Sequence, residues 1–178
     1  MSATREDFDA RARALKLLLF DVDGVLTDGG ITLDGTGGEV KRFFVRDGSA
    51  LVWARRAGLA IGLLSGRASP VTLRRAAELG LDVVRQDGPD KRGPFARILE
   101  EQAVSDSEVG YMGDDLLDLP VLMRVGLAAA PADAVPEVRE RVHWVSDHRG
   151  GHGAVRQFVE RVLRARERWD ALVEEHLA

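Results

Sequence analysis

Short apolar runs that alternate with helix-like segments are the feature that most limits how this chain can fold. Most of the segments between the runs have apolar residues at helical spacing, as in Phe95, Ile98 and Leu99. This alternation predicts an α/β fold, a Rossmann-like parallel sheet with helices on both faces. The length of 178 residues fits a single domain over residues 1–178. The six runs are Leu17–Phe20, Leu59–Leu64, Leu81–Val84, Val109–Met112, Gly126–Ala130 and His143–Val145.

Three segments lie outside this alternation. Residues 31–45 hold a Gly-rich turn between two short extended runs, which predicts a β-hairpin. From Ala154 onward, apolar residues form one stripe and Arg and Glu fill the opposite face. This pattern predicts one long helix packed on the core or on another subunit. Residues 1–14 are expected to form an N-terminal helix or a frayed end.

The composition excludes several classes of protein. A formal net charge of -4 gives no basic surface for a nucleic acid, so any anionic substrate must be held by a metal ion or by a few placed cations. The absence of cysteine excludes disulfides and thiolate metal sites. No apolar run is long enough for a membrane span or a signal-peptide core. We therefore expect a cytoplasmic protein with no nucleic-acid or membrane partner.

Polar residues gather where the predicted strands end. In open α/β sheets, ligands bind at the carboxyl ends of the strands, so these residues are candidates for one shared site. Four strand ends supply two carboxylate pairs, a hydroxyl group and an ammonium group. In chain order the candidates are Asp21 and Asp23, then Ser65, Gly66 and Arg67, then Lys91, which follows Asp90, and finally Asp114 and Asp115.

This set of groups suits a magnesium ion and a phosphoryl group. Magnesium prefers a few carboxylates, which Asp21 and Asp114 can supply, together with water and phosphate oxygens. A carboxylate such as Asp21 can also attack phosphorus, and a turn at Gly24 would bring Asp23 back to the leaving oxygen. Ser65 and Lys91 can donate hydrogen bonds to the phosphoryl oxygens.

Each piece also has a purely structural interpretation. Asp23–Gly24 is a common turn sequence, and Ser65 can cap a helix. Lys91 can be an ordinary solvated lysine, and the pair Asp114–Asp115 can satisfy a helix N-terminus. The phosphoryl-transfer hypothesis rests on all four groups following strands in one order, which the separate structural interpretations do not explain.

The motifs resemble those of the haloacid dehalogenase superfamily of phosphohydrolases. "DVDGVLTDG", "LLSGR", "DK" and "YMGDDLLDLPVL" match the four motifs of that superfamily. "FFVRDG" at residues 43–48 and "GGHGAVR" at residues 150–156 are similar to signatures of its sugar-acid phosphatases, which act on 3-deoxy-manno-octulosonate 8-phosphate in lipopolysaccharide biosynthesis. The resemblance runs from about Leu17 to Phe158.

The resemblance implies a role for each matching residue. Asp21 would be the nucleophile and a Mg²⁺ ligand, and Asp23 would be the general acid and base with its carbonyl on the metal. Asp114 would be a metal ligand, Asp115 would orient the metal shell, and Asp118 would be structural. Ser65 and Lys91 would hold the phosphoryl group. The residues expected to contact the phosphorylated sugar acid are Gly66, Arg67, Arg46 and Asp47.

The spacing of the motifs leaves no room for the separate cap domain that many superfamily members carry. The intervals from Asp21 to Ser65 and from Ser65 to Lys91 are too short for one, and the first holds the hairpin instead. An open site then needs a large substrate or a neighbouring subunit to close it. In the resembling family, hairpins assemble a homotetramer, which we expect here too.

Two departures from the family pattern bear on the substrate. Gln86 is followed by Asp87, where the family often has glycine, and the chain ends in "EEHLA" where many members have a Gly-containing tail. Phosphatases for nine-carbon keto sugar acids share the same motifs, so they remain an alternative. Two alternatives from another class are a receiver-like phosphoacceptor domain and a silent relative. The order of the acidic residues and the intact catalytic set argue against them.

Overall fold

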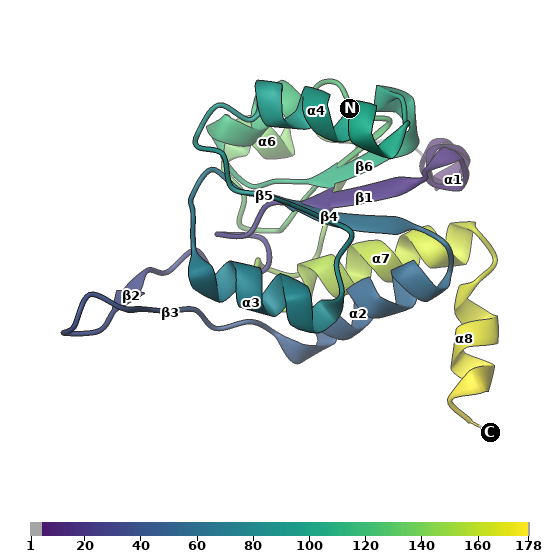
Figure 1. Ribbon diagram of the computed structural model, residues 1–178. Coiled ribbons are helices and arrows are strands. Elements are labelled where there is room, and N and C mark those ends of the chain that lie inside the picture. The colour runs from purple at the N-terminus through teal and green to yellow at the C-terminus, as the bar shows by residue number, and fades with distance from the viewer. Residues whose placement is uncertain (1–4, 178) are drawn as a thin grey trace.

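Six parallel strands form the central sheet, in the spatial order β5-β4-β1-β6-β7-β8 (Figure 1). The structure is a computed structural model that describes residues 5–177, and all counts of strands, helices and contacts refer to that part of the chain. Each predicted apolar run forms one of these strands, so the α/β prediction is confirmed. The strands are β1 (Leu17–Phe20), β4 (Ala60–Leu64), β5 (Val83–Arg85), β6 (Val109–Met112), β7 (Leu127–Ala130) and β8 (Trp144–Val145).

Helices cover both faces of the sheet. Figure 1 shows α2, α3 and α7 on one face, with α4 and α6 on the other. No helix among residues 5–177 is long and apolar enough to cross a membrane. The first face carries α1 (Arg5–Ala14), α2 (Val45–Arg56), α3 (Pro70–Leu79) and α7 (Ala154–Ala165), and the second carries α4 (Arg92–Gln102), α5 (Leu119–Leu122) and α6 (Pro136–Arg139). Two short 3-10 helices are η1 (Asp106–Glu108) and η2 (Leu116–Asp118).

The central strand β1 is buried on both sides. Leu17 and Leu19 pack into the core under α4, whereas Leu18 and Phe20 pack into the core under α2 and α7. This follows from the alternation of side chains along a strand. Phe20 pairs in register with Leu63 of β4 and Met112 of β6, so the loops after these three strands emerge at one edge.

The predicted hairpin is present but shorter than expected. β2 (Thr32–Leu33) and β3 (Glu39–Val40) pair over two residues each and extend away from the sheet (Figure 1). Asp34 fixes the turn by accepting hydrogen bonds from the N–H groups of Thr36 and Gly38 at 2.9 and 2.7 Å. The prediction that the hairpin runs to Val45 is wrong, because the chain turns inward at Phe43, which packs on the core, and α2 begins at Val45.

The predicted long C-terminal helix is two helices, α7 and α8 (Trp169–Glu175). The helical conformation is interrupted at Glu167, whose φ is 57°. The guanidinium of Arg166 there donates hydrogen bonds to the carbonyls of Ala12, Arg13 and Leu15 at 2.9 to 3.2 Å. The end of α7 is therefore set by its bonds to the end of α1. At the N-terminus, Arg5–Ala14 forms a helix, which is one of the two structures expected for residues 1–14. Residues 1–4 lie outside the described part of the chain.

Asp47 links α2 to α7. Its side chain is fully buried, and its carboxylate accepts hydrogen bonds from the N–H groups of Arg156 at 2.7 Å and Gly153 at 3.3 Å. Burial raises the pKa of Asp47, although these two N–H groups stabilise its charged form. The carboxylate therefore satisfies amide groups at the start of α7 that the helix itself leaves unpaired.

We expect Asp47→Ala to lower the free energy of unfolding by about 1–3 kcal/mol, because it leaves buried amide groups without an acceptor. Urea unfolding followed by circular dichroism measures this. The control is Asp170→Ala, since the side chain of Asp170 is 94% exposed and its loss should change stability by less than about 0.5 kcal/mol. Equal midpoints for the two variants would show that Asp47 does not stabilise the start of α7.

Candidate active site

Asp21 is held at the end of β1 by contacts from three sides. Its N–H donates to the carbonyl of Met112 at 3.0 Å, which continues the pairing of β1 with β6. Oδ1 accepts a hydrogen bond from the N–H of Val22 at 2.7 Å, and Oδ2 lies 3.0 Å from Nζ of Lys91. Each carboxylate oxygen of Asp21 thus has a fixed position.

Lys91 is the N-cap residue that precedes α4 and is almost completely buried, with 1% of its side chain exposed. Its ammonium group contacts Asp21, Oδ1 of Asp118 at 2.6 Å and the hydroxyl of Tyr111 at 3.1 Å. Burial lowers the pKa of Lys91, but the charges of Asp21 and Asp118 outweigh burial, so the net shift is upward. The solvated-lysine interpretation is therefore excluded, and Lys91 is a fixed cation beside Asp21.

Asp118 organises the loop after β6. It is fully buried, and its Oδ2 accepts hydrogen bonds from the N–H groups of Asp114 at 2.9 Å and Asp115 at 3.2 Å. Its Oδ1 accepts hydrogen bonds from Lys91 and from the hydroxyl of Tyr111. The structural role expected for Asp118 agrees with these contacts, but the sequence did not show that Asp118 and Tyr111 hold Lys91.

Three carboxylates at this edge fit a divalent cation. One oxygen each from Asp21, Asp114 and Asp118 lies within 4.8 Å of the others. The pKa of Asp21 is raised to about 7, mainly by burial and next by the charge of Asp118. The pKa of Asp114 is raised to about 8, mainly by burial and next by the charge of Asp21. Oδ1 of Asp114 is buried without a hydrogen-bond partner among residues 5–177, whereas Asp118 is fully bonded. Asp114 is therefore the carboxylate with an oxygen free for a cation, and Asp21, whose two oxygens each have one contact among residues 5–177, lies beside it.

The approach of Asp114 to the β1 loop requires glycine at position 24. Gly24 has a φ of 89°, which favours glycine, and a Cβ atom there would lie 2.0 Å from Oδ2 of Asp114. A second glycine serves the same loop, because a Cβ on Gly150 would lie 1.8 Å from the carbonyl oxygen of Gly24. These contacts explain two of the glycines in the motifs.

The pocket at this edge has a volume of about 340 Å³. Ser65 lies in it with its Oγ accepting a hydrogen bond from the N–H of Arg67 at 3.2 Å, while the cap of α3 is Ser69, which accepts from Thr72. The capping interpretation of Ser65 is thus wrong. The pocket brings together eight of the ten predicted site residues: Asp21, Asp23, Ser65, Gly66, Arg67, Lys91, Asp114 and Asp115.

Two predicted site residues, Arg46 and Asp47, do not line this pocket. The prediction that Asp47 contacts the substrate is wrong, because its buried carboxylate caps α7. Arg46 is exposed beside the ring of Phe44, 6.0 Å from the ring centre. Asp115 lines the pocket but also accepts a hydrogen bond from the N–H of Leu116 at 2.7 Å, which caps η2. Its expected effect on a metal shell stays a prediction.

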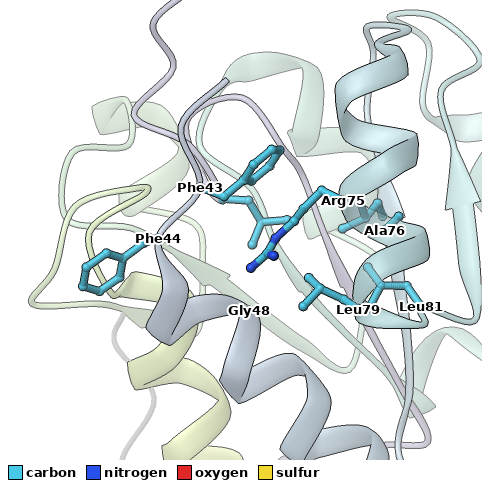
Figure 2. A pocket seen from close by; sticks show the side chains of 9 residues that line it. Phe43, Phe44, Gly48, Arg75, Ala76, Leu79 and Leu81 are labelled. Atoms are coloured by element: carbon cyan, nitrogen blue, oxygen red, sulfur yellow. The ribbon is translucent and has the colours of Figure 1, made fainter. Parts of the chain in front are cut away.

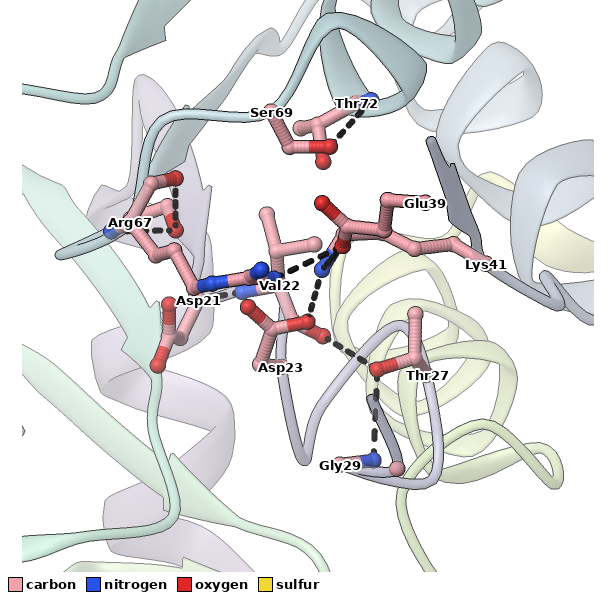
Figure 3. A network of polar contacts seen from close by, with 12 residues as sticks. Asp21, Val22, Asp23, Thr27, Gly29, Glu39, Lys41, Arg67, Ser69 and Thr72 are labelled. Atoms are coloured by element: carbon pink, nitrogen blue, oxygen red, sulfur yellow. Dashed lines mark hydrogen bonds and ion pairs between the residues drawn. The ribbon is translucent and has the colours of Figure 1, made fainter. Parts of the chain in front are cut away.

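Two residues of the hairpin segment complete the site, and sequence reasoning missed both. The ammonium of Lys41 contacts Oδ1 of Asp23, and it lies 3.0 Å from Oε1 of Glu39. The same Glu39 oxygen accepts a hydrogen bond from Arg67 at 2.7 Å (Figure 3). Opposite charges in "GEVKR" were the only local signal, and they could not show the contact with Asp23.

A second hollow lies between α2 and α3 and is lined by apolar side chains with Arg75 across them (Figure 2). Its volume of about 10 Å³ holds at most one water molecule. We interpret it as a packing gap and not as a binding site.

Comparison with known proteins places the chain in a family. No protein-family model matches it. Among curated proteins, the 3-deoxy-D-manno-octulosonate 8-phosphate phosphatase KdsC of Escherichia coli K12 is 38% identical over 164 residues, which is 92% of this chain and 87% of the relative. The protein of the same name from Yersinia pestis is 36% identical over 163 residues, 92% of this chain and 87% of the relative. The chain belongs to the KdsC phosphatase family.

Solved structures agree with this assignment. A probable YrbI family phosphatase from Pseudomonas syringae has a TM-score of 0.95 at 39% identity and covers 97% of this chain and 98% of its own. The 3-deoxy-D-manno-octulosonate 8-phosphate phosphatase of Moraxella catarrhalis, in complex with magnesium, phosphate and the sugar acid, has a TM-score of 0.94 at 31% identity over 96% and 98% of the two chains. The resemblance stated from the motifs is confirmed, and this KdsC-family member is a phosphatase with the fold of its superfamily.

The clustered carboxylates make the stability of the metal-free phosphatase depend on pH. Asp21 and Asp114, with folded pKa values of about 7 and 8, bind more protons when folded than when unfolded between about pH 4 and pH 8. Stability should therefore fall as pH rises through that window. In chelator, we expect the melting temperature to drop less between about pH 6 and pH 9 for Asp114→Asn than for the parent, whereas Asp170→Asn should follow the parent. Identical drops in all three proteins would contradict this.

Proposed function

We propose that this phosphatase hydrolyses 3-deoxy-D-manno-octulosonate 8-phosphate, with magnesium, through an aspartyl-phosphate on Asp21. The observation that carries the proposal is the buried contact between Oδ2 of Asp21 and Nζ of Lys91, beside the acidic cluster. The names of the relatives support the substrate, and the magnesium, phosphate and sugar acid in the Moraxella catarrhalis complex support the site chemistry.

In the first half-reaction, a carboxylate oxygen of Asp21 attacks phosphorus. The bond from phosphorus to the sugar oxygen breaks, its electron pair stays on that oxygen, and Asp23 gives that oxygen a proton. Lys91 and Ser65 donate hydrogen bonds to the phosphoryl oxygens as charge moves between them. Lys91 suits this task because its ammonium is already fixed beside the nucleophile.

In the second half-reaction, the carboxylate of Asp23 takes a proton from water. The water oxygen attacks phosphorus, the bond from phosphorus to Asp21 breaks, and inorganic phosphate leaves. Asp21 is returned as a carboxylate and Asp23 as an acid, so the cycle closes without another reactant.

The groups that would hold magnesium are the carboxylates of Asp21 and Asp114 and the backbone carbonyl of Asp23. The ion would neutralise phosphate charge and the repulsion between the two carboxylates. Gly66, Arg67 and Arg46 remain the proposed contacts to the sugar acid. Arg67 lines the pocket beside Ser65, and its guanidinium is partly exposed for such a contact.

We expect Asp21→Asn to lose at least about 10³-fold in turnover, because the amide is not a nucleophile. Asp28→Asn is the matched control from the same loop, since Asp28 is exposed and its carboxylate contacts Arg42 and the N–H of Gly30. Acid quenching during turnover should trap a phosphorylated parent protein and no phosphorylated Asp21→Asn. Near-parental activity of Asp21→Asn would exclude the aspartyl-phosphate.

A panel of eight-carbon and nine-carbon sugar-acid phosphates, assayed with magnesium, tests the proposed substrate. A preference for a nine-carbon acid would replace 3-deoxy-D-manno-octulosonate 8-phosphate as the proposed substrate.

We further propose that the active unit is a homotetramer built in part from the hairpin. Ile31, Leu33 and Val40 are 57%, 68% and 57% exposed, and an isolated two-stranded hairpin is marginally stable in water. Ile31 also lines the phosphate pocket. Packing of the hairpin against neighbouring copies would cover these side chains and close the open pocket in one arrangement.

Leu33→Lys should dissociate this assembly, because it places a charge in the proposed apolar contact. Activity on the sugar-acid phosphate should then fall more than activity on 4-nitrophenyl phosphate, which needs fewer contacts. Leu177→Lys is the control, since Leu177 is also exposed but lies at the far end of the chain. Light scattering measures the mass, and a fully active parent monomer at assay concentration would refute the proposal.

A further inference from the structure

Lys41 is buried in a position that the reaction described so far does not explain. Only 1% of its side chain is exposed, although it belongs to a hairpin segment that is otherwise largely exposed. Lysine is rarely buried to this extent without a charged partner, because removal of its ammonium from water is costly. The partners here are Oδ1 of Asp23 and Oε1 of Glu39, the latter at 3.0 Å.

The contact with Lys41 restricts the carboxyl group of Asp23. Among residues 5–177, the Asp23 side chain has no other hydrogen bond or ion pair, so Lys41 alone fixes its orientation. Figure 3 shows the Asp23 carboxylate between Asp21 and Lys41. Oδ1 is thus occupied by the ammonium, and Oδ2 is left for a reacting group.

The position of Lys41 is itself fixed. Oε1 of Glu39 accepts from Lys41 and, at 2.7 Å, from Nη1 of Arg67, which follows β4 in the same pocket. Asp23, Lys41, Glu39 and Arg67 therefore form a continuous chain of alternating charges from the β1 loop, through the hairpin segment, to the β4 loop (Figure 3). Such a chain holds each of its members more firmly than one ion pair would.

We propose that Lys41 is a positioning residue for Asp23, so that the hairpin segment supplies part of the acid–base machinery of its own subunit. The inference rests on the proposed role of Asp23 in proton transfer to the leaving oxygen. A proton donor must lie within hydrogen-bonding distance of that oxygen, and a misplacement of about 1 Å can cost about 10²-fold in rate. Lys41 itself does not touch the reacting atoms.

The leaving group separates this role from a purely structural one. The first half-reaction needs an acid when an alkoxide leaves, but not when 4-nitrophenolate leaves, since that anion is stable without a proton. The second half-reaction needs Asp23 as a base for every substrate. A misplaced Asp23 therefore slows both half-reactions of an alkyl phosphate, but only the second half-reaction of 4-nitrophenyl phosphate. A disordered hairpin would instead slow the first half-reaction of the two substrates equally.

The test is rapid-mixing kinetics on Lys41→Met, with Arg42→Met as the matched control. Arg42 is the neighbouring cation, is 73% exposed and pairs with Asp28 instead of Asp23. We expect Lys41→Met to release one 4-nitrophenolate per site in a fast burst, then turn over about 10²-fold more slowly than the parent. Its first step with an alkyl phosphate should also fall about 10²-fold. Arg42→Met should behave like the parent, and Lys41→Arg should recover most of the loss.

Equal losses in the rate of the first step for the two kinds of substrate, or parental kinetics in Lys41→Met, would overturn the inference. Lys41→Gln gives the same measurement if the methionine variant does not fold. Asp23→Asn separates this failure from failure of the proposed function. If Asp23→Asn shows the burst and the lysine variants do not, only the role of Lys41 is wrong. If Asp23→Asn also shows no dependence on the leaving group, the role of Asp23 as acid and base is wrong.

Discussion

Negative charge buried at the carboxyl ends of β1 and β6 is the constraint on which the rest of this structure depends. Asp21, Asp114 and Asp118 approach within 4.8 Å at buried or half-buried positions, an arrangement that is costly without a compensating cation. Lys91 compensates part of it from the start of α4, and backbone N–H groups of the β6 loop compensate another part. What remains uncompensated, above all at Asp114, is the property that suits the site to a metal ion and a phosphate.

The strands and the main site residues could be predicted from the sequence because both depend on local signals. A run such as Leu17–Phe20, apolar at every position, indicates a strand buried on both faces, and the structure has it with the same bounds. Parallel strands end at one edge, so the polar residues after them had to meet. This is why the site brings together residues that are far apart in the sequence, namely Asp21, Ser65, Lys91 and Asp114.

The errors lie where distant residues decide the outcome. The apolar stripe of the C-terminal segment continues through Trp169, and neither Gly nor Pro marks the break, which Arg166 fixes through carbonyls at the end of α1. The motif around Asp47 predicts a contact with the substrate, but the contacts of Asp47 with α7 are formed only in the folded chain. The pairing of Lys41 with Asp23 is likewise a tertiary contact, since a turn sequence does not specify where the returning strand ends.

The place of β1 in the middle of the sheet has a consequence for how the chain acquires its chemistry during synthesis. β1 leaves the ribosome before every strand that flanks it, and its pairing with β6 spans about half of the chain. Contacts between residues far apart in sequence form slowly, and domains generally fold as units. Asp21 therefore emerges long before Lys91 and Asp114, and α7, which covers the same strand, comes later still. Asp21 is among the first residues to be made and among the last to find its surroundings.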